Sequence, residues 1–210
     1  MQYLYLHGFA SGPQSTKAQA LRSHFQALGL TLTLPDLNQG DFTHLTLTRQ
    51  IQQVVPLVTP NTVLIGSSLG GLVASWVAQR TPVARLILLA PAFNFLNQWL
   101  PRLGPDALER WQQTGLLSMY HYAQQRPVPL HYDFLTDAQR YDEAHLSRAI
   151  PTLILHGERD DVVSLAGSEA YAAPRPWVTL KALPTDHSMT DVIDQIWAEV
   201  QLFCGLVPVS

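Results

Sequence analysis

Short apolar runs alternate along the chain with segments whose apolar residues recur every three or four positions. The runs are nearly continuous, which is typical of parallel strands covered on both faces. They predict strands at Gln2–Leu6, Leu30–Leu34, Thr62–Ile65, Arg85–Ala90, Thr152–Leu155 and Trp177–Ala182. The segments between them predict helices at Ser15–Leu28, Leu45–Val58, Leu69–Gln79, Leu165–Ala172 and Met189–Phe203. This alternation favours a doubly wound α/β sheet with right-handed crossovers.

One segment interrupts the alternation. The stretch from Pro91 to Ile150 is too long for a simple crossover and is rich in aromatic residues. Its first part has a helical pattern, whereas Val128–Leu135 is consistent with extended chain. An insertion here would cover the carboxyl ends of the strands, where open α/β sheets bind ligands. We therefore predict a single domain over residues 1–210 with a small helical cap at about 92–150. Most aromatic residues of the cap are expected only to pack it onto the domain. The candidates for a substrate pocket are Phe93, Phe95, Trp99, Met119 and Tyr120.

Composition narrows the class of protein. The chain has 210 residues, of which 47% are hydrophobic and 14% charged, enough for one domain with a substantial core. Its net charge is −3 without a basic block, so nucleic acid is not an expected partner. No apolar run reaches the roughly 20 residues of a membrane span. Cys204 is the single cysteine, which excludes an intrachain disulfide and favours a cytoplasmic protein. We expect Cys204 to be a buried apolar residue rather than a nucleophile. These patterns leave the oligomeric state open.

The motif Gly66-Ser67-Ser68-Leu69-Gly70 is the most informative stretch of the chain. It has the pattern Gly-x-Ser-x-Gly, follows an apolar run directly and precedes a predicted helix. A strand that turns sharply into a helix at a serine is the nucleophile elbow of α/β-hydrolases. The glycines permit the tight turn, and the hydroxyl of Ser68 then stands clear of the sheet.

A serine nucleophile needs a general base and an acid that orients it, and in this fold the acid precedes the histidine along the chain. Asp160 follows the fifth predicted strand in the stretch His156-Gly157-Glu158-Arg159-Asp160. Asp161 competes for the role, and either acid could merely cap the following turn. His187 follows the last strand and precedes the last helix, which is the position required of the base. No close spacing of histidines favours a metal site.

Two backbone N–H groups should stabilise the oxyanion that forms on the substrate. One belongs to Leu69, the residue after the nucleophile, at the start of a helix. The other is expected in the loop after the first strand, Leu6-His7-Gly8-Phe9, where the amide of Phe9 is the natural donor.

The N-terminal stretch from Tyr5 to Ala18, which includes His-Gly-Phe and a serine-rich turn ending in Lys17-Ala18, resembles the opening of the small bacterial YqiA-like esterases. Pro35-Asp36-Leu37 and the serine motif also match, and the second half is similar to α/β-hydrolases more generally. The resemblance implies a three-layer α/β-hydrolase fold with a mostly parallel sheet of about six strands. It also implies hydrolysis of esters or thioesters through Ser68, Asp160 and His187 without a cofactor.

The expected activity is therefore hydrolysis of short to medium acyl esters. A thioesterase acting on acyl-CoA or acyl-protein would use the same residues, and a peptidase is less favoured because no acidic site for a substrate amine is evident. Rarer uses of such a triad are cofactor-free haloperoxidases and lyases. A binding protein that keeps the scaffold without catalysis is the alternative from another class.

Overall fold

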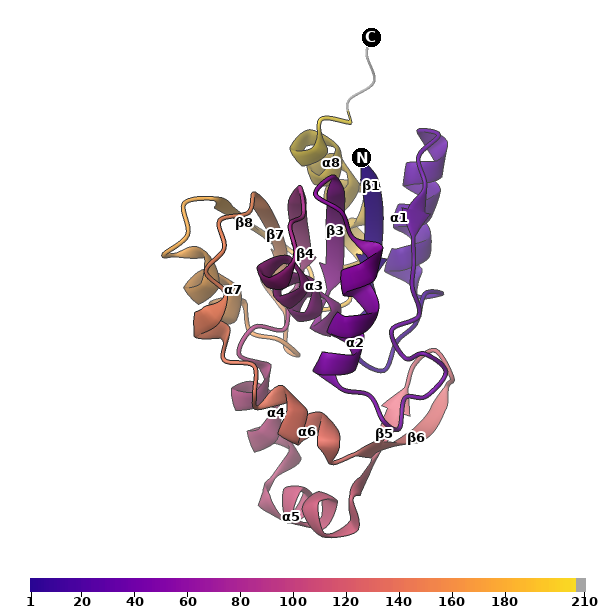
Figure 1. The fold of residues 1–210 in the computed structure, drawn as a ribbon, viewed down its shortest axis with the longest axis vertical. Coiled ribbons are helices and arrows are strands. Elements are labelled where there is room, and N and C mark those ends of the chain that lie inside the picture. The colour runs from indigo at the N-terminus through magenta and orange to yellow at the C-terminus, as the bar shows by residue number, and fades with distance from the viewer. Residues whose placement is uncertain (207–210) are drawn as a thin grey trace.

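A parallel sheet forms the centre of the structure (Figure 1). In residues 1–206, which the computed structural model describes, six strands lie in the order β2-β1-β3-β4-β7-β8, and every neighbouring pair is parallel. The strands are β1 Gln2–Leu6, β2 Leu32–Thr33, β3 Thr62–Ser67, β4 Arg85–Leu89, β7 Thr152–Gly157 and β8 Val178–Leu183. The strand order reverses between β1 and β3, so their following loops diverge and leave a crevice at the carboxyl edge.

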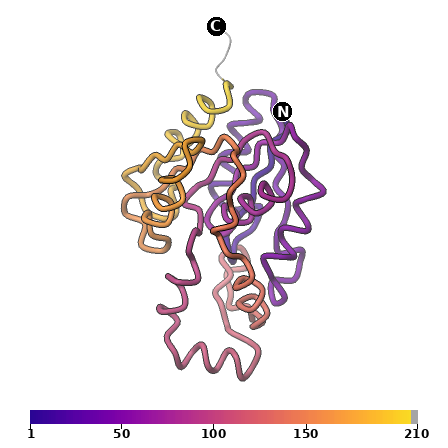
Figure 2. The backbone as a smooth tube through the Cα atoms, turned by 60° about the vertical axis from the view of Figure 1, so that its left-hand side comes forward, coloured from indigo at the N-terminus to yellow at the C-terminus, as the bar shows by residue number. Residues whose placement is uncertain are grey.

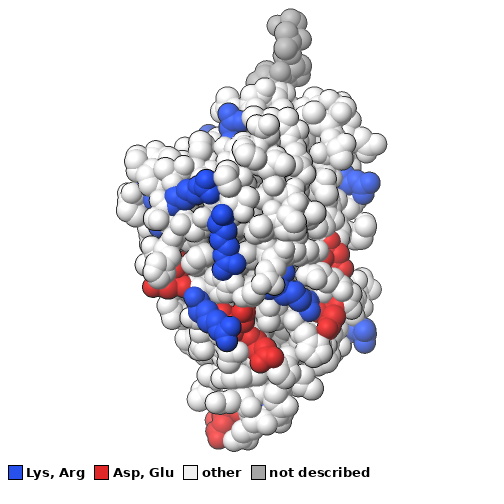
Figure 3. Space-filling model, in the orientation of Figure 1, with Lys and Arg blue, Asp and Glu red and all other residues white. Residues whose placement is uncertain are grey.

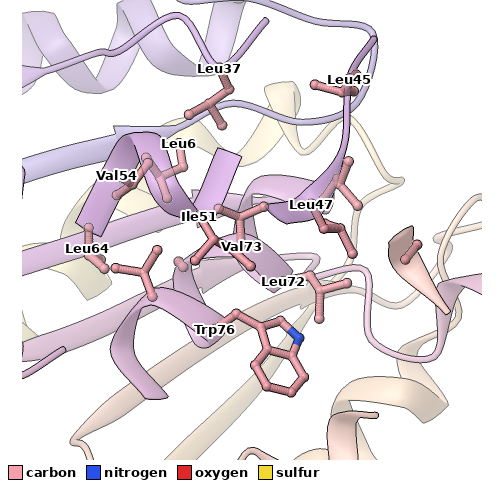
Figure 4. Close-up of a cluster of buried hydrophobic side chains, with 14 of the residues drawn as sticks. Leu6, Leu37, Leu45, Leu47, Ile51, Val54, Leu64, Leu72, Val73 and Trp76 are labelled. Carbon is pink, nitrogen blue, oxygen red and sulfur yellow. The ribbon is translucent and has the colours of Figure 1, made fainter. Parts of the chain in front are cut away.

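Helices cover both faces of the sheet, which gives the three-layer arrangement predicted from the sequence. One face carries α1 (Thr16–Ala27) and α8 (Ile193–Cys204), and the other carries α2 (Leu47–Val54), α3 (Leu69–Arg80) and α7 (Leu165–Ala172). Successive strand residues point to opposite faces. On the α2 and α3 side, buried residues of the two helices pack on those of β1 and β3 (Figure 4); the labelled members include Leu6, Leu64, Ile51, Val54, Val73 and Trp76.

The segment between β4 and β7 forms the cap at the end of the domain where the strands terminate (Figures 1 and 2). It holds helices α4 (Phe95–Leu103), α5 (Pro105–Thr114) and α6 (Asp133–Ala138). It also holds an antiparallel hairpin of β5 (Leu116–His121) and β6 (Arg126–His131). The description of the cap as helical therefore covers only part of it. The extended chain expected from Val128 to Leu135 ends at His131, where α6 follows.

The ends of several elements differ from the prediction. The second strand, at one edge of the sheet, pairs only over β2, Leu32–Thr33. The predicted helix to Val58 changes at Val55 to the 3₁₀ helix η1, Val55–Leu57, since Pro56 lacks the N–H that an α-helix needs. The last helix begins at Ile193, after the 3₁₀ helix η3, Thr190–Val192, because Met189 (φ 53°) and Val192 (φ −120°, ψ 22°) both depart from α-helical backbone angles.

The surface is largely uncharged on the side shown in Figure 3, where Lys and Arg are interspersed with Asp and Glu. Within residues 1–206, no helix combines the length and the apolar character that crossing a bilayer requires.

Candidate active site

Ser68 lies at the tip of the turn between β3 and α3. Its φ of 53° and ψ of −122° put a non-glycine residue in a strained region of backbone space. Hydrogen bonds hold that conformation: the Ser68 N–H donates to the Leu89 carbonyl at 2.9 Å, and the Ser68 carbonyl accepts from the amides of Gly71 and Ala92 at 2.8 and 3.0 Å. The hydroxyl is thereby held at the carboxyl edge of the sheet.

Gly70 allows the turn to pack against the neighbouring strand. A Cβ at this position would overlap the carbonyl oxygen of Leu6 and lie 2.5 Å from that of His7. The elbow and the loop after β1 therefore touch backbone to backbone, which brings the amide of Phe9 to the same crevice as Ser68. This close approach explains why the motif has a glycine two residues after the serine.

Hydrogen bonds connect Asp160, His187 and Ser68 in series. Nδ1 of His187 donates to Oδ2 of Asp160 at 2.7 Å, and Nε2 of His187 lies 3.1 Å from Oγ of Ser68. Because a carboxylate only accepts, the proton is on Nδ1, and the lone pair of Nε2 faces the serine hydroxyl. The competing acid Asp161 is exposed and has no side-chain hydrogen bond within the described residues. The structure thus brings Asp160, and not Asp161, to the histidine.

The loops carrying the acid and the histidine pack on each other. The amide of Arg159 donates to the Thr185 carbonyl at 3.0 Å. A Cβ at Gly157 would lie 2.5 Å from the Thr185 carbonyl oxygen and 2.7 Å from that of Asp186, so only glycine fits between the loops. This contact fixes the distance between Asp160 at the end of β7 and His187 beyond the end of β8.

The side chain of Asp160 is completely buried, and both of its carboxylate oxygens have partners. Oδ1 accepts from the amides of Val162 and Val163 at 2.9 and 2.8 Å. Oδ2 accepts from His187, and Nε2 of His156 lies 3.2 Å from the same oxygen. Burial by itself would raise the pKa of this carboxyl, but the hydrogen bonds from His156, His187 and Val163 outweigh it and hold the pKa well below its usual range.

The contact of His156 with Asp160 is a feature that the sequence did not indicate. The ring is buried: Nε2 also lies 3.0 Å from the Val163 carbonyl, and Nδ1 lies 2.8 Å from the hydroxyl of Ser168. Nε2 faces only acceptors, so it carries the proton, and Nδ1 accepts from Ser168. The N–H of Nε2 therefore donates to the Val163 carbonyl and also lies beside the carboxylate oxygen that accepts from His187.

The amides of Phe9 and Leu69 have no acceptor within the described residues, as is required of groups that would bind an oxyanion. Leu69 opens helix α3, so the helix dipole favours negative charge at this point. The ring of Phe9 packs against Phe42 and Phe134, each with centroids at 5.3 Å, and this aromatic contact anchors the loop that carries its amide. His7 also stabilises the same loop, because its Nε2 accepts a hydrogen bond from the amide of Leu37 at 2.9 Å.

A cavity of about 690 Å³ opens beside Ser68 and His187. Four of the five predicted pocket residues line it: Phe95, Trp99, Met119 and Tyr120. Phe93 does not. Its ring is buried under helix α7 and stacks on Tyr171 with centroids 4.1 Å apart, so its assignment to the pocket is corrected to a packing role. The cavity wall also contains Phe134 and Lys17, which the sequence did not indicate.

Two other expectations concern groups outside the cavity. Cys204 is half-buried at the end of α8, and burial raises the pKa of its thiol to about 11, which disfavours the nucleophilic thiolate. Within residues 1–206, no group of three or more His, Cys, Asp or Glu side chains is arranged to hold a metal ion.

Known proteins share both the family and the fold of this chain. The model of an uncharacterised protein family, UPF0227, matches residues 2–204, which confirms the relationship to the YqiA-like proteins inferred from the N-terminal motifs. Among solved structures, the mouse alpha/beta hydrolase domain-containing protein 10 superposes with a TM-score of 0.76 over 98% of this chain and 90% of its own, at 21% identity. A putative hydrolase from Agrobacterium vitis S4 gives a TM-score of 0.79 over 96% and 87%, also at 21% identity. Both confirm the α/β-hydrolase fold.

A curated relative is the pimeloyl-[acyl-carrier protein] methyl ester esterase of Klebsiella pneumoniae, which is 33% identical over 158 residues. The aligned region covers 70% of this chain and 58% of the relative. The chain therefore spans less than two thirds of the length of this relative.

Proposed function

We propose that this chain, which belongs to the uncharacterised protein family UPF0227, is a serine hydrolase that cleaves carboxylic esters. The observation that carries the proposal is the hydrogen-bonded series from Asp160 through His187 to Ser68 on the wall of a largely apolar cavity. The name of the Klebsiella relative, an ester esterase, supports the same class of reaction.

In the first half of the proposed reaction, Oγ of Ser68 attacks the ester carbonyl carbon. Nε2 of His187 takes the hydroxyl proton, and the imidazolium is stabilised by Asp160, which stays ionised. The carbonyl oxygen becomes negatively charged and accepts hydrogen bonds from the amides of Leu69 and Phe9. Loss of one such donor typically costs about 10²–10³ in turnover.

The tetrahedral intermediate then collapses, and the bond between the carbonyl carbon and the alcohol oxygen breaks. His187 returns its proton to the departing alcohol, which leaves an acyl group on Ser68. In the second half, water attacks the acyl carbon while His187 again takes the proton. Collapse of the second intermediate frees the carboxylic acid and restores the hydroxyl of Ser68.

The aromatic wall from the cap favours an apolar acyl group of short to medium length. Phe95, Trp99 and Phe134 contact one another with centroids about 6 Å apart and form a continuous surface. Thioesters pass through the same acyl-enzyme, so a thioesterase remains the second candidate. The choice between them depends on the leaving group rather than on the three residues.

The test is hydrolysis of a 4-nitrophenyl ester series from acetate to palmitate by the wild type and by Ser68→Ala. We expect Ser68→Ala to lose at least about 10³-fold in kcat while keeping its fold by circular dichroism. Ser67→Ala is the matched control, since it removes the adjacent hydroxyl, which does not contact His187. The preferred chain length measures the acyl pocket, and matched acyl-CoA substrates compare esters with thioesters.

Full activity of Ser68→Ala would disprove the proposed nucleophile. A wild-type protein that hydrolyses none of these substrates, and whose Ser68 does not react with a fluorophosphonate probe, would instead be a binding protein on a hydrolase scaffold.

A further inference from the structure

The cavity contains a lysine without an ion-pair partner. Lys17, the second residue of α1, lines the cavity together with Ser68 and His187. Its Nζ makes one hydrogen bond, a long one of 3.4 Å to the carbonyl oxygen of His187. No carboxylate oxygen of residues 1–206 lies within 4.0 Å of it. By contrast, Lys181, the other lysine of the chain, contacts both oxygens of Glu199 at 2.7 Å.

The position of Lys17 is costly for a cation, because burial removes the water that would otherwise solvate it. This burial lowers the pKa of the ammonium to about 8, and the charges of Asp160 and Asp186 oppose the change only in part. Lys17 is still mainly charged at pH 7. The geometry therefore holds a partly desolvated positive charge beside the proposed reaction centre.

Of the two acids that offset this charge, Asp160 is engaged through both carboxylate oxygens, and Asp186 is engaged through one. Both oxygens of Asp160 accept hydrogen bonds from the histidines and amides described above. Oδ1 of Asp186 accepts from the amide and hydroxyl of Ser188 and from the amide of Met189. Neither acid forms a direct pair with Lys17, which leaves its N–H donors free for a ligand in the cavity.

The wall around Lys17 differs chemically from the cap. Ser11, Ser15 and Thr16, from the loop after β1 and the start of α1, line the cavity next to it, whereas the cap contributes mainly aromatic residues. Asp161 and Asp186 also reach the cavity, and both are exposed. Both carboxylates would repel an anion, so an anion in the cavity would need direct contact with the ammonium of Lys17 to offset that repulsion.

We propose that Lys17 and the neighbouring hydroxyls form a subsite for an anionic group of the substrate, a carboxylate or a phosphate, carried by the molecule whose ester Ser68 attacks. This inference rests on the proposed esterase function and narrows its substrate to acyl esters that bear a negative charge. The subsite binds the non-reacting part of the substrate, so Lys17 contributes affinity and orientation and does not act on the reacting atoms.

The experiment compares 4-nitrophenyl half-esters of C6 to C8 dicarboxylic acids with 4-nitrophenyl alkanoates of equal carbon number, after subtraction of spontaneous hydrolysis. The wild type is expected to prefer the half-esters in kcat/KM. Lys17→Met should lower kcat/KM for half-esters by about 10- to 100-fold, the usual value of a hydrogen bond to a charged group. Lys17→Met should lower kcat/KM for alkanoates by less than about threefold. Lys17→Arg should keep the preference for half-esters over alkanoates.

A second measurement does not depend on turnover. Binding of adipate and of inorganic phosphate to Ser68→Ala and to the double variant with Lys17→Met is followed by calorimetry. Lys17-dependent binding of adipate identifies a carboxylate subsite, and Lys17-dependent binding of phosphate alone identifies a phosphate subsite. Absence of Lys17-dependent binding of either anion overturns the inference.

The outcomes separate this inference from the proposed function. Ser68-dependent hydrolysis of alkanoates without a preference for half-esters retains the esterase and rejects the anionic subsite. An equal loss on both substrate series in Lys17→Met also rejects it, because Lys17 would then act only by holding the backbone of His187. Activity that does not depend on Ser68 rejects the proposed mechanism itself.

Discussion

Asp160 accepts hydrogen bonds on both carboxylate oxygens, whereas its neighbour Asp161 is exposed and accepts none from a side chain or amide of the described residues. Asp160→Asn is expected to reduce kcat by about 10⁴-fold, because the amide can donate to His187 and favour the tautomer with its proton facing Ser68. Asp161→Asn carries the same chemical change one residue away and should stay within about threefold of the wild type. Steady-state kinetics on one 4-nitrophenyl ester tests both.

Similar losses in the two variants would contradict the assignment of Asp160. So would a normal kcat for Asp160→Asn in a protein whose folding is verified by circular dichroism.

His156 gives a second prediction at the level of single residues. His156→Gln keeps a side chain of comparable reach but alters the donor that faces Asp160 and the acceptor that faces Ser168. We expect kcat to fall about tenfold, with little change in KM, and the free energy of unfolding to fall by about 1–3 kcal/mol. If His156 acts through Asp160, its effect on kcat should disappear in an Asp160→Asn background, whereas a purely structural role would leave the two losses multiplicative.

The order of motifs along the chain was enough to predict the three side chains that lie in hydrogen-bond series. Each follows a parallel strand, and the carboxyl ends of parallel strands meet at one edge. The roles of Phe93, His156 and Lys17 were not predictable in the same way. Phe93 follows β4 just as a pocket residue would, but its ring turns under α7, and sequence spacing does not give side-chain direction. The contacts of Lys17 depend on a residue 170 positions away.

At the level of elements, the cap is connected to the domain through helices α6 and α2. The carboxylate of Asp137 in α6 is buried and accepts from the amide and the hydroxyl of Thr48, at 2.8 and 2.6 Å, in the first turn of α2. Negative charge is favourable at the start of a helix. Asp137→Asn should therefore lower the free energy of unfolding by about 1–3 kcal/mol. Urea denaturation with an unchanged m-value would measure this loss.

Asp133→Asn is the control on the same helix. Asp133 is exposed and lies 3.0 Å from His131 at the surface, so its replacement should change stability by less than about 1 kcal/mol. Equal stability of the Asp137 and Asp133 variants would show that the contact with Thr48 does not hold the cap.

Hydrophobic patterning predicted the elements of the sheet and its covering helices better than those of the cap. Buried strands give continuous apolar runs, whereas exposed and half-buried residues alternate along β5 in a short segment. The partner strand β6 contains Pro127 and Pro129, which weaken any prediction of a strand. They are tolerated because β6 has a strand on one side only. A proline whose nitrogen faces the open side loses no hydrogen bond to the partner strand.

At the level of the whole molecule, topology assembles the site from distant segments. The reversal of strand order between β1 and β3 opens the crevice, into which the loop bearing Phe9 and the elbow bearing Ser68 both project. The strands on the other side of β4 deliver Asp160 and His187 to the same edge. The cap supplies an aromatic wall of the cavity, and the start of α1 supplies the cationic side chain of Lys17. One cavity therefore combines an apolar and a charged surface.

That combination predicts how the preference for charged substrates depends on pH. The ammonium of Lys17, with a pKa lowered to about 8 by burial, is charged below that pH and neutral above it. Among the groups that face it, Asp160 and Asp186 have lowered pKa values and stay ionised, and burial raises the pKa of Tyr5 to about 12. The ratio of kcat/KM for half-esters to that for alkanoates should therefore be highest at pH 6 to 7 and fall as the pH rises through 8 to 10. The ratio should stay constant in Lys17→Arg, because a guanidinium keeps its charge in this range. Rate profiles of both substrate series from pH 6 to 10 test the prediction. A wild-type ratio that is flat or rises with pH would contradict it, because a loss of positive charge from the cavity can only weaken the binding of an anion.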